Sequence, residues 1–423
     1  MSKKIIISNG VVLLIDNIPA SNAVSVGLWL NIGSRDEKKH DHGISHFTEH
    51  MLFKGTRKRS YYNIAQEIDS AGGEINGATS KENTHYYVNI TSEYFKKALD
   101  ILIDMFFNSS FDKKEFDKER FVILDEIDMS VDDPGDYVFD IFARALWGSH
   151  PFGLPVIGEK EAIKKIRIED LKHYYKNNYI APAMIISAAG NVNEMELQKE
   201  SEACLKQLNT ENKVVYQKDN REKPESITRN VTVNRDIEQV YFICGRDGYS
   251  CRDENRFPMA LLNMILGSSF SSRLFQKVRE REGLCYSIGS SSASYSDVGE
   301  FTISFSTSVK NLPFILDAIN NELKLIKSEN ISKEELENAK GRFWGSYVLA
   351  QEINEWKMVK MAVQEMMFGR LIPYNETLHK IKSITLEDLN RVAVDVLTGE
   401  KFSFASIGPE GKEKYLKGFK FSF

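Results

Sequence analysis

The feature that most constrains this fold is an internal repeat. The stretch KKIRIEDL at 164–171 resembles KSITLEDL at 382–389, and Gly190 and Gly408 follow these stretches in similar contexts. Both pairs are 218 residues apart (382 − 164 and 408 − 190). A third pair, FDKKEFDKERFVI at 111–123 and ISKEELENAKGRF at 331–343, is 220 residues apart (331 − 111). A nearly constant offset predicts two copies of one fold.

We therefore expect two domains, at 1–212 and 230–423, joined by a polar linker at 213–229. A chain of 423 residues is too long for one ordinary core. In each copy, strand-forming runs cluster between long amphipathic helices and do not alternate strictly with them. This order favours an α+β fold in which each domain is a mostly antiparallel sheet packed with helices.

Composition excludes several functional classes. The net charge of −5 gives no general attraction to nucleic acid or to anionic membranes, and no apolar run is long enough to span a bilayer. The four cysteines form no CxxC pair, so we expect a reducing compartment and, by default, a cytoplasmic location. The start, MSKKIIISNGVVLLI, is interpreted as a β-hairpin that turns at Asn9 and Gly10 rather than as a signal peptide.

The pentapeptide HFTEH at 46–50 is the first candidate for a catalytic metal site. On a helix, His46 and His50 share a face one turn apart, with Glu49 beside them. Two such imidazoles can bind one zinc ion, and the neighbouring carboxylate can take a proton from water at the metal. The alternative is a solvated helix face. His40 and His42, just upstream in a charged loop, are expected to be solvated.

A catalytic zinc site needs a third protein ligand. The segment DKKEFDKERFVILDEIDMSVDD at 112–133 predicts a helix on which Glu119 and Glu126, seven residues apart, share a face. Spacing alone leaves both carboxylates open as the ligand. An ordinary charged helix face is the simpler alternative.

HxxEH, followed 76 residues after His50 by Glu126 (126 − 50), resembles the pitrilysin/insulinase (inverzincin) metallopeptidases. Further segments are similar to the mitochondrial-processing-peptidase branch, namely SNGVVLLID, GLWLNIGSRDE, GGEINGATSKENTHYY and GSSFSSRLFQKVREREGLCYSI. The resemblance therefore covers nearly the whole chain. The resemblance implies that His46, His50 and Glu126 bind Zn2+, and that Glu49 is the general base. It implies that Glu119 orients a ligand histidine. It also implies two homologous α+β domains per chain, which together form half of a clamshell.

The stretch GGEINGATSKENTHYYVNIT at 72–91 has a glycine pair, a polar turn and an alternating strand. An edge strand here could pair with an extended peptide through main-chain hydrogen bonds. A plain hairpin explains the residues equally well. The resemblance favours substrate binding, with Asn76, Gly77, Ala78 and Thr79 near the scissile bond.

The second copy offers Arg279 and Tyr286, seven residues apart in VREREGLCY. Both side chains can stabilise an oxyanion, although both residue types are common on surfaces. The resemblance implies that they complete the catalytic site, and that two chains of this length form its closed chamber as a homodimer or a heterodimer with a paralogue. Asp136 and Asp140 can bind a basic group or belong to a solvated acidic turn. The resemblance favours a preference for a basic residue near the cleavage site.

The leading prediction is a zinc-dependent endopeptidase that cleaves peptides or unfolded, presequence-like segments in a closed chamber formed by two chains. The alternative is a non-catalytic peptide-binding or assembly subunit with the same fold. All the expected positions are filled, from His46 to Tyr286, which favours the enzyme. The expected partners are a peptide substrate and a second chain, with neither nucleic acid nor membrane.

Overall fold

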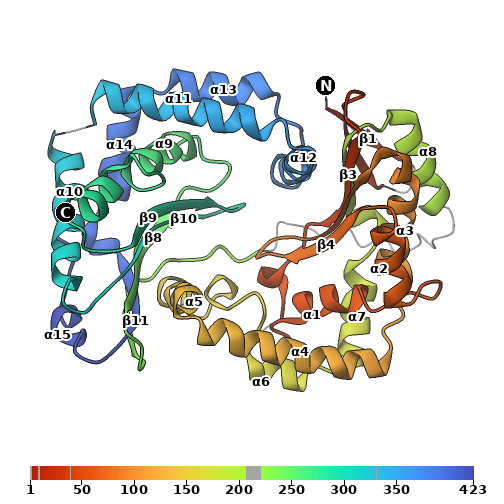
Figure 1. Cartoon of the computed structure of the whole chain (residues 1–423), viewed down its shortest axis with the longest axis horizontal. Coiled ribbons are helices and arrows are strands. Elements are labelled where there is room, and N and C mark those ends of the chain that lie inside the picture. The colour runs from red at the N-terminus through yellow and green to blue at the C-terminus, as the bar shows by residue number, and fades with distance from the viewer. Residues whose placement is uncertain (1, 8–9, 39, 206–220, 330) are drawn as a thin grey trace. The chain divides into compact units, whose positions relative to one another are not determined.

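The computed structural model describes residues 2–7, 10–38, 40–205, 221–329 and 331–423 (Figure 1). The chain forms two compact units, neither of which is continuous in sequence. The first unit comprises Met1–Asp128, Pro155–Arg221 and Val348–Ile372, and the second comprises Met129–Leu154, Glu222–Tyr347 and Pro373–Phe423. Of the expected linker, residues 213–220 lie outside the described residues, and so does Asn9 of the expected N-terminal turn.

The first unit contains a six-stranded sheet with strand order β1-β2-β6-β3-β5-β4. Its strands are β1 (Lys3–Ile6), β2 (Val12–Asn17), β3 (Ala23–Leu30), β4 (Glu74–Thr79), β5 (Thr84–Thr91) and β6 (Met184–Gly190). Only β2 and β6 are parallel, and β1 and β2 form the predicted antiparallel hairpin. The sequence of β5 alternates, and Thr84, Tyr86, Val88 and Ile90 are buried on one face of the strand. This pattern is expected when one face of a strand is covered more fully than the other.

Helices cover both faces of this sheet. The helices that begin in the first unit are α1 (Ile44–Leu52), α2 (Tyr61–Asp69), α3 (Phe95–Asn108), α4 (Lys113–Asp132), α6 (Lys160–Lys165), α7 (Ile168–Asn178), α8 (Glu194–Leu205) and α12 (Asn354–Phe368). The helix α3 packs on β3 and β5, whereas α12 packs on β2, β3 and β6. The central strand β6 is therefore buried along its whole length, which explains its unbroken run of small and apolar residues.

The second unit contains a five-stranded sheet with strand order β7-β11-β8-β10-β9. Its strands are β7 (Asn230–Asn234), β8 (Val240–Gly248), β9 (Ser287–Ser294), β10 (Gly299–Thr307) and β11 (Ser403–Gly408). Its helices are α5 (Pro134–Trp147), α9 (Arg256–Leu266), a π-helical segment at Phe275–Arg281, α10 (Leu312–Glu329), α11 (Lys333–Ala350), α13 (Tyr374–Ser383), α14 (Leu386–Val396) and α15 (Glu413–Leu416).

The two sheets share one topology, which confirms the duplication read from the sequence. The order β2-β6-β3-β5-β4 corresponds to β7-β11-β8-β10-β9, and in both sheets the first pair of this series is parallel. The repeats exchange one helix. In chain order, α5 lies between β5 and β6 of the first sheet but packs on β8 and β11 of the second. Likewise, α12 lies between β10 and β11 of the second sheet but packs on β2, β3 and β6 of the first. The boundaries expected from the repeat did not include this exchange.

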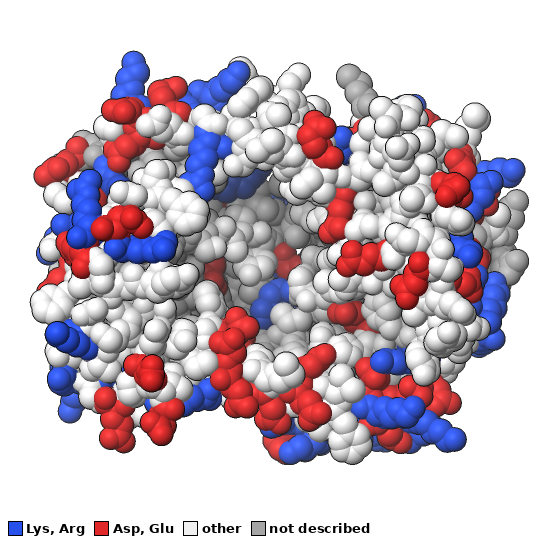
Figure 2. All heavy atoms as spheres, viewed as in Figure 1, with Lys and Arg blue, Asp and Glu red and all other residues white. Residues whose placement is uncertain are grey.

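Within the described residues, no helix is both long and apolar enough to cross a membrane. On the face shown in Figure 2, lysines and arginines are interspersed with aspartates and glutamates. The four cysteines, all of them described, are free thiols.

Candidate metal centre

The helix α1 is held by its apolar side and by a carboxylate at its start. Ile44, Phe47 and Met51 are buried, so this side of the helix faces the core. The helix follows Gly43, whose φ of 90° lies in the left-handed region that favours glycine. In place of an ordinary cap, the Glu37 carboxylate accepts hydrogen bonds from the Gly43 and Ser45 N–H groups at 2.8 and 2.9 Å.

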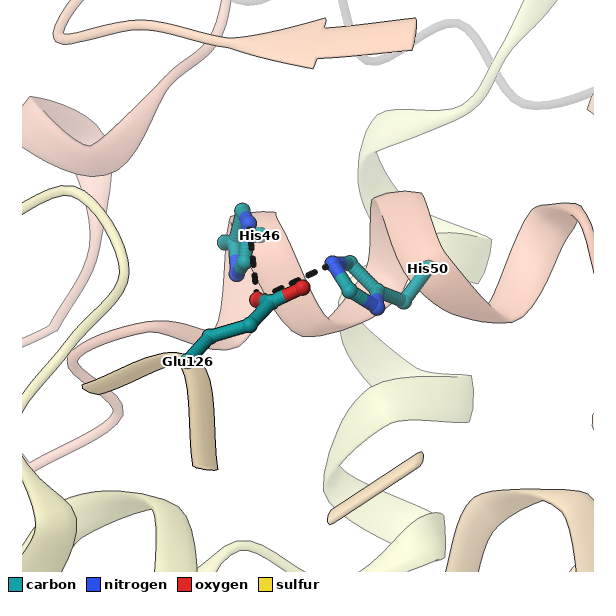
Figure 3. A group of neighbouring side chains, drawn as sticks. All are labelled: His46, His50 and Glu126. Atoms are coloured by element: carbon teal, nitrogen blue, oxygen red, sulfur yellow. Dashed lines mark ion pairs between the residues drawn. The ribbon is translucent and has the colours of Figure 1, made fainter. Parts of the chain in front are cut away.

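His46 and His50 project from α1 toward Glu126 on α4 (Figure 3). Oε2 of Glu126 lies 4.0 Å from Nε2 of His46 and 3.5 Å from Nε2 of His50. The three ligand atoms all lie within 4.8 Å of one another. Zinc bonds of about 2.0–2.2 Å in a tetrahedral site separate neighbouring ligand atoms by about 3.3–3.6 Å. These three side chains therefore fit the ligand set of a zinc ion.

Burial keeps His46 in the form that a metal needs. Its pKa is lowered to about 3, mainly by burial and further by the nearby His50, so the ring is neutral near pH 7. Its Nδ1 atom is buried and has no hydrogen-bond partner among the residues that the structure describes. A neutral imidazole with Nε2 directed at Glu126 is suited to ligate zinc.

His50 contacts both carboxylates that the sequence left open on α4, and each of them faces a different nitrogen of its ring. Nδ1 of His50 lies 3.1 Å from Oε2 of Glu119, whose other oxygen is 2.7 Å from the Lys54 ammonium. Burial alone would lower the pKa of His50. The hydrogen bond to Glu119 and the charges of Glu126 and Glu49 outweigh it and raise the pKa. Glu126 thus faces the Nε2 atoms, and Glu119 faces the opposite side of one ring.

Glu49 is buried on α1 and accepts a hydrogen bond from the Thr79 hydroxyl at 2.6 Å. Burial raises the pKa of Glu49, and the charge of Glu126 adds to this. The Thr79 hydrogen bond and His50 oppose the shift without cancelling it. A carboxyl group with a raised pKa, fixed beside the two histidines, can take up and return a proton near neutral pH.

The strand β4, which contains Asn76 to Thr79, is an edge strand. It pairs with β5 on one side and ends the sheet on the other, and α1 packs against it (Figure 1). Asn76 and Ala78 are exposed. At Gly77 a Cβ atom would lie 3.0–3.1 Å from the Phe53 and Tyr86 rings, so this position is tightly packed. One edge of the strand pairs with no other strand among the described residues, and this edge strand lies beside α1.

The remaining predicted site residues belong to the second unit. Arg279 lies in the π-helical segment, with its guanidinium 5.3 Å from the centre of the Tyr286 ring. Tyr286 is 80 % exposed. Asp136 and Asp140 lie one turn apart on α5. The His46–His50–Glu126 cluster therefore contains none of these four residues.

Sequence reasoning missed several supporting groups, and one expectation was wrong. His42 is not solvated: it is buried, with Nδ1 3.7 Å from Oε2 of Glu37, whereas His40 is exposed as expected. The parts played by Glu37, Lys54 and the Thr79 hydroxyl were not predicted, because they depend on contacts between segments that local patterns do not relate. A carboxylate six residues before Gly43 was the only available signal for Glu37 (43 − 37).

Comparison with known proteins identifies the family. The sequence model described as Insulinase (Peptidase family M16) matches residues 11–160, and that of the Peptidase M16 inactive domain matches residues 165–343. The protein named uncharacterized zinc protease YmxG of Bacillus subtilis is 36% identical over 97% of this chain and 99% of its own length. The chain belongs to the insulinase family of peptidases, M16.

Further comparisons agree with this family and with the fold. An uncharacterized zinc protease of Rickettsia bellii is 34% identical over 98% of this chain and 98% of its own length. A solved protease structure from Helicobacter pylori has a TM-score of 0.88 at 18% identity, covering 97% of this chain and 100% of that one. An M16 inactive domain from Pseudomonas fluorescens has a TM-score of 0.85 at 19% identity, covering 96% and 98%. Both support the predicted α+β fold. Zinc is the cofactor, given these zinc-protease relatives and the His-His-Glu cluster.

Proposed function

We propose that this M16 chain is a zinc-dependent endopeptidase in which His46, His50 and Glu126 hold the metal and Glu49 is the general base. The observation that carries the proposal is the convergence of these four side chains from α1 and α4. The buried Glu49 has a raised pKa and lies beside the ligand set, where a purely structural metal site would have no use for it.

The proposed chemistry divides the work among a few side chains. Zinc, when bound, supplies a Lewis acid for water and for a peptide carbonyl. Glu49 removes a proton from the attacking water and delivers it to the leaving amine. The Thr79 hydroxyl donates to Oε2 of Glu49 at 2.6 Å and so orients the carboxylate for proton transfer. Glu119 orients the ring of His50 from its Nδ1 side.

The unpaired edge of β4 is the proposed substrate-binding strand. An extended peptide that adds to this edge forms main-chain hydrogen bonds along Asn76 to Thr79. Since Thr79 also contacts Glu49, the same strand would align the backbone of the substrate with the general base. Binding of this kind recognises several residues of extended main chain. It therefore favours peptides and unfolded segments as substrates over folded proteins.

The second unit is proposed to complete the site. Arg279 and Tyr286 lie together, and the exposed Tyr286 phenol is free of any burial that would prevent it from reaching an oxyanion. We propose that the complete site lies in a closed chamber built by two chains. Asp136 and Asp140 are proposed to favour substrates with a basic residue near the cleavage site.

Cleavage of a quenched fluorescent peptide that contains an arginine tests this function. The purified chain is assayed as prepared, after removal of metal with a chelator, and after zinc is restored. The proposal predicts cleavage that is lost on chelation and recovered with zinc. A chain that binds one zinc ion but cleaves no peptide would contradict the proposal and favour the alternative, a non-catalytic peptide-binding or assembly subunit.

A further inference from the structure

Arg221 is the first described residue after 206–220 and the last residue of its segment of the first unit. Its guanidinium donates to both carboxylate oxygens of Asp36, each at 2.7 Å, in the paired geometry that only arginine provides. It also donates to the Glu82 side chain at 3.5 Å and to the Asn31 carbonyl at 3.3 Å. The side chain of Arg221 is only 7 % exposed, and those of Asp36 and Glu82 are 1 % and 2 % exposed.

These contacts join two loops. Asp36 lies in the loop between β3 and α1, and Glu82 lies in the turn between β4 and β5. The loops already touch: Ser34 and Arg35 N–H groups donate to the Ser80 and Lys81 carbonyls at 3.0 and 2.8 Å. The approach is so close that a Cβ atom at Gly33 would lie 2.3 Å from the Ser80 oxygen. Arg221 therefore neutralises and ties together a buried junction between the two loops.

Each loop leads directly to the metal centre. The residue after Asp36 is Glu37, whose carboxylate caps the start of α1, the helix that carries His46, Glu49 and His50. Three residues before Glu82 is Thr79, whose hydroxyl holds the Glu49 carboxylate. The two elements that set the position of Glu49 thus meet at a buried cluster. In it Arg221 bridges Asp36 and Glu82, and Arg35 also pairs with Glu82, at 2.6 Å.

We propose that Arg221 is a positioning residue for the metal site, which it stabilises by locking the β3–α1 loop to the β4–β5 turn. It touches neither the ligand set nor Glu49, and acts through Glu37 and Thr79. Its effect on turnover rests on the proposed peptidase function, whereas its effect on zinc affinity does not. Removal of Arg221 leaves Asp36 and Glu82 with less positive charge in a buried place, so that both loops are expected to shift.

The test uses the full-length chain with Arg221→Ala, and Arg221→Lys as the conservative variant. Zinc affinity is measured by competition with a chromophoric chelator, and kcat and KM are measured with a quenched peptide. We expect Arg221→Ala to weaken zinc affinity and lower kcat about tenfold each, because supporting groups of a metal site have effects of this size. Because Arg221 touches no substrate-binding residue, KM should change little. The zinc affinity and kcat of Arg221→Lys should lie between those of Arg221→Ala and those of the wild type.

Chemical rescue separates positioning from general destabilisation. Guanidinium chloride, well below the concentration that unfolds the chain, should restore zinc affinity and kcat to Arg221→Ala, and sodium chloride should not. The matched control is Arg273→Ala in the second unit. Arg273 also bridges two carboxylates, with Glu335 at 2.6 Å and Glu322 at 3.2 Å. This control should keep wild-type zinc affinity and kcat within twofold and show no rescue.

A folded Arg221→Ala chain with wild-type zinc affinity and kcat would overturn the proposal. So would losses that guanidinium leaves unchanged and Arg273→Ala reproduces. If Arg221→Ala does not fold, the proposal is tested by the zinc affinity of Arg221→Lys. A zinc affinity equal to that of the wild type would then overturn the proposal. If the wild type cleaves no peptide, the proposed function fails. The zinc-affinity comparison still tests the role of Arg221.

Discussion

At the scale of single residues, His46 and His50 face the same carboxylate but have opposite electrostatic surroundings. Burial holds His46 neutral, with a pKa of about 3, whereas the carboxylates around His50 raise its pKa. A hydrogen bond from Nδ1–H of His50 to Glu119 leaves the lone pair of Nε2 directed toward Glu126. On the proposed function, Glu119 sets which nitrogen of His50 faces the metal.

The substitution Glu119→Gln should weaken zinc binding about 10–100-fold, the usual range for such supporting carboxylates. The amide keeps the shape of the side chain but removes the charge that faces His50 and Lys54. Competition with a chromophoric chelator measures the affinity. The control is Asp117→Asn on the same helix, where Asp117 pairs with Lys113 at the surface. Equal affinities for wild type and Glu119→Gln would show that Glu119 does not support the metal site.

The helical spacing of His46 and His50 predicted their shared face, because spacing of this kind is a property of one element. The choice between Glu119 and Glu126 was not decided by spacing, since both lie on the same face of one helix. Only distances between α1 and α4 separate them, with Glu119 near Nδ1 of His50 and Glu126 near the Nε2 atoms. His42 was misjudged for a related reason: its burial against Glu37 comes from the fold of the loop.

At the scale of secondary-structure elements, β4 combines two roles. One of its edges pairs with β5, and the other ends the sheet. Natural edge strands that expose their backbone are usually short, and this one spans only Glu74–Thr79. Its last residue contacts Glu49, so its position is tied to that of α1.

Methylation of a single backbone nitrogen of the substrate should therefore slow cleavage. Loss of one main-chain hydrogen bond of about 1 kcal/mol corresponds to about a fivefold fall in kcat/KM. A series of peptides, each methylated at one amide near the cleavage site, measures this. Amides that point toward β4 should be sensitive and those that point away should not, which gives an alternating pattern. Equal rates along the series would argue against pairing with β4.

The start of α11 offers a prediction about pH. Arg273, and then Ser332, hold the pKa of Glu335 at about 2, against an ordinary value of 4.5. Because the folded pKa is lowered, this contribution to stability is fully present above about pH 4.5 and is lost as pH falls toward 2. Glu335→Gln should lower the thermal midpoint at neutral pH, and the gap to wild type should narrow across this window. Glu337→Gln, which loses only a surface pair with Lys340, is the control. A difference in thermal midpoint between wild type and Glu335→Gln that stays the same at every pH would contradict the lowered pKa of Glu335.

The elements themselves were largely predictable, because alternation and amphipathic spacing are local. The strands β5 and β10, and the helix caps at Asp112 and Ser332, follow from short patterns. The exchange of α5 and α12 was not predictable, since the apolar pattern of a helix does not specify which sheet it packs on. In the structure, α5 shares a buried cluster with β8 and β11, and α12 shares one with β2, β3 and β6.

At the scale of the whole molecule, the residues proposed for the site come from both units of the duplicated fold. The metal cluster lies in the first unit and the Arg279–Tyr286 pair lies in the second. If two chains build each site, inactive chains with different defects should complement one another. Glu49→Gln and Tyr286→Phe, each inactive or nearly so alone, should regain about a quarter of wild-type activity on random reassortment into dimers. No recovery, with exchange of chains verified, would place each site within one chain.

The central claim is that this chain cleaves peptides with a bound zinc ion and Glu49 as the base. The most direct test compares the wild type with Glu49→Gln for zinc content and for turnover of one quenched peptide. Glutamine keeps the size of the side chain and its contact with Thr79 but cannot accept the proton. The account predicts one zinc ion per chain in both proteins, with cleavage by the wild type and a loss of at least about a hundredfold in the variant. Equal turnover by both would contradict it.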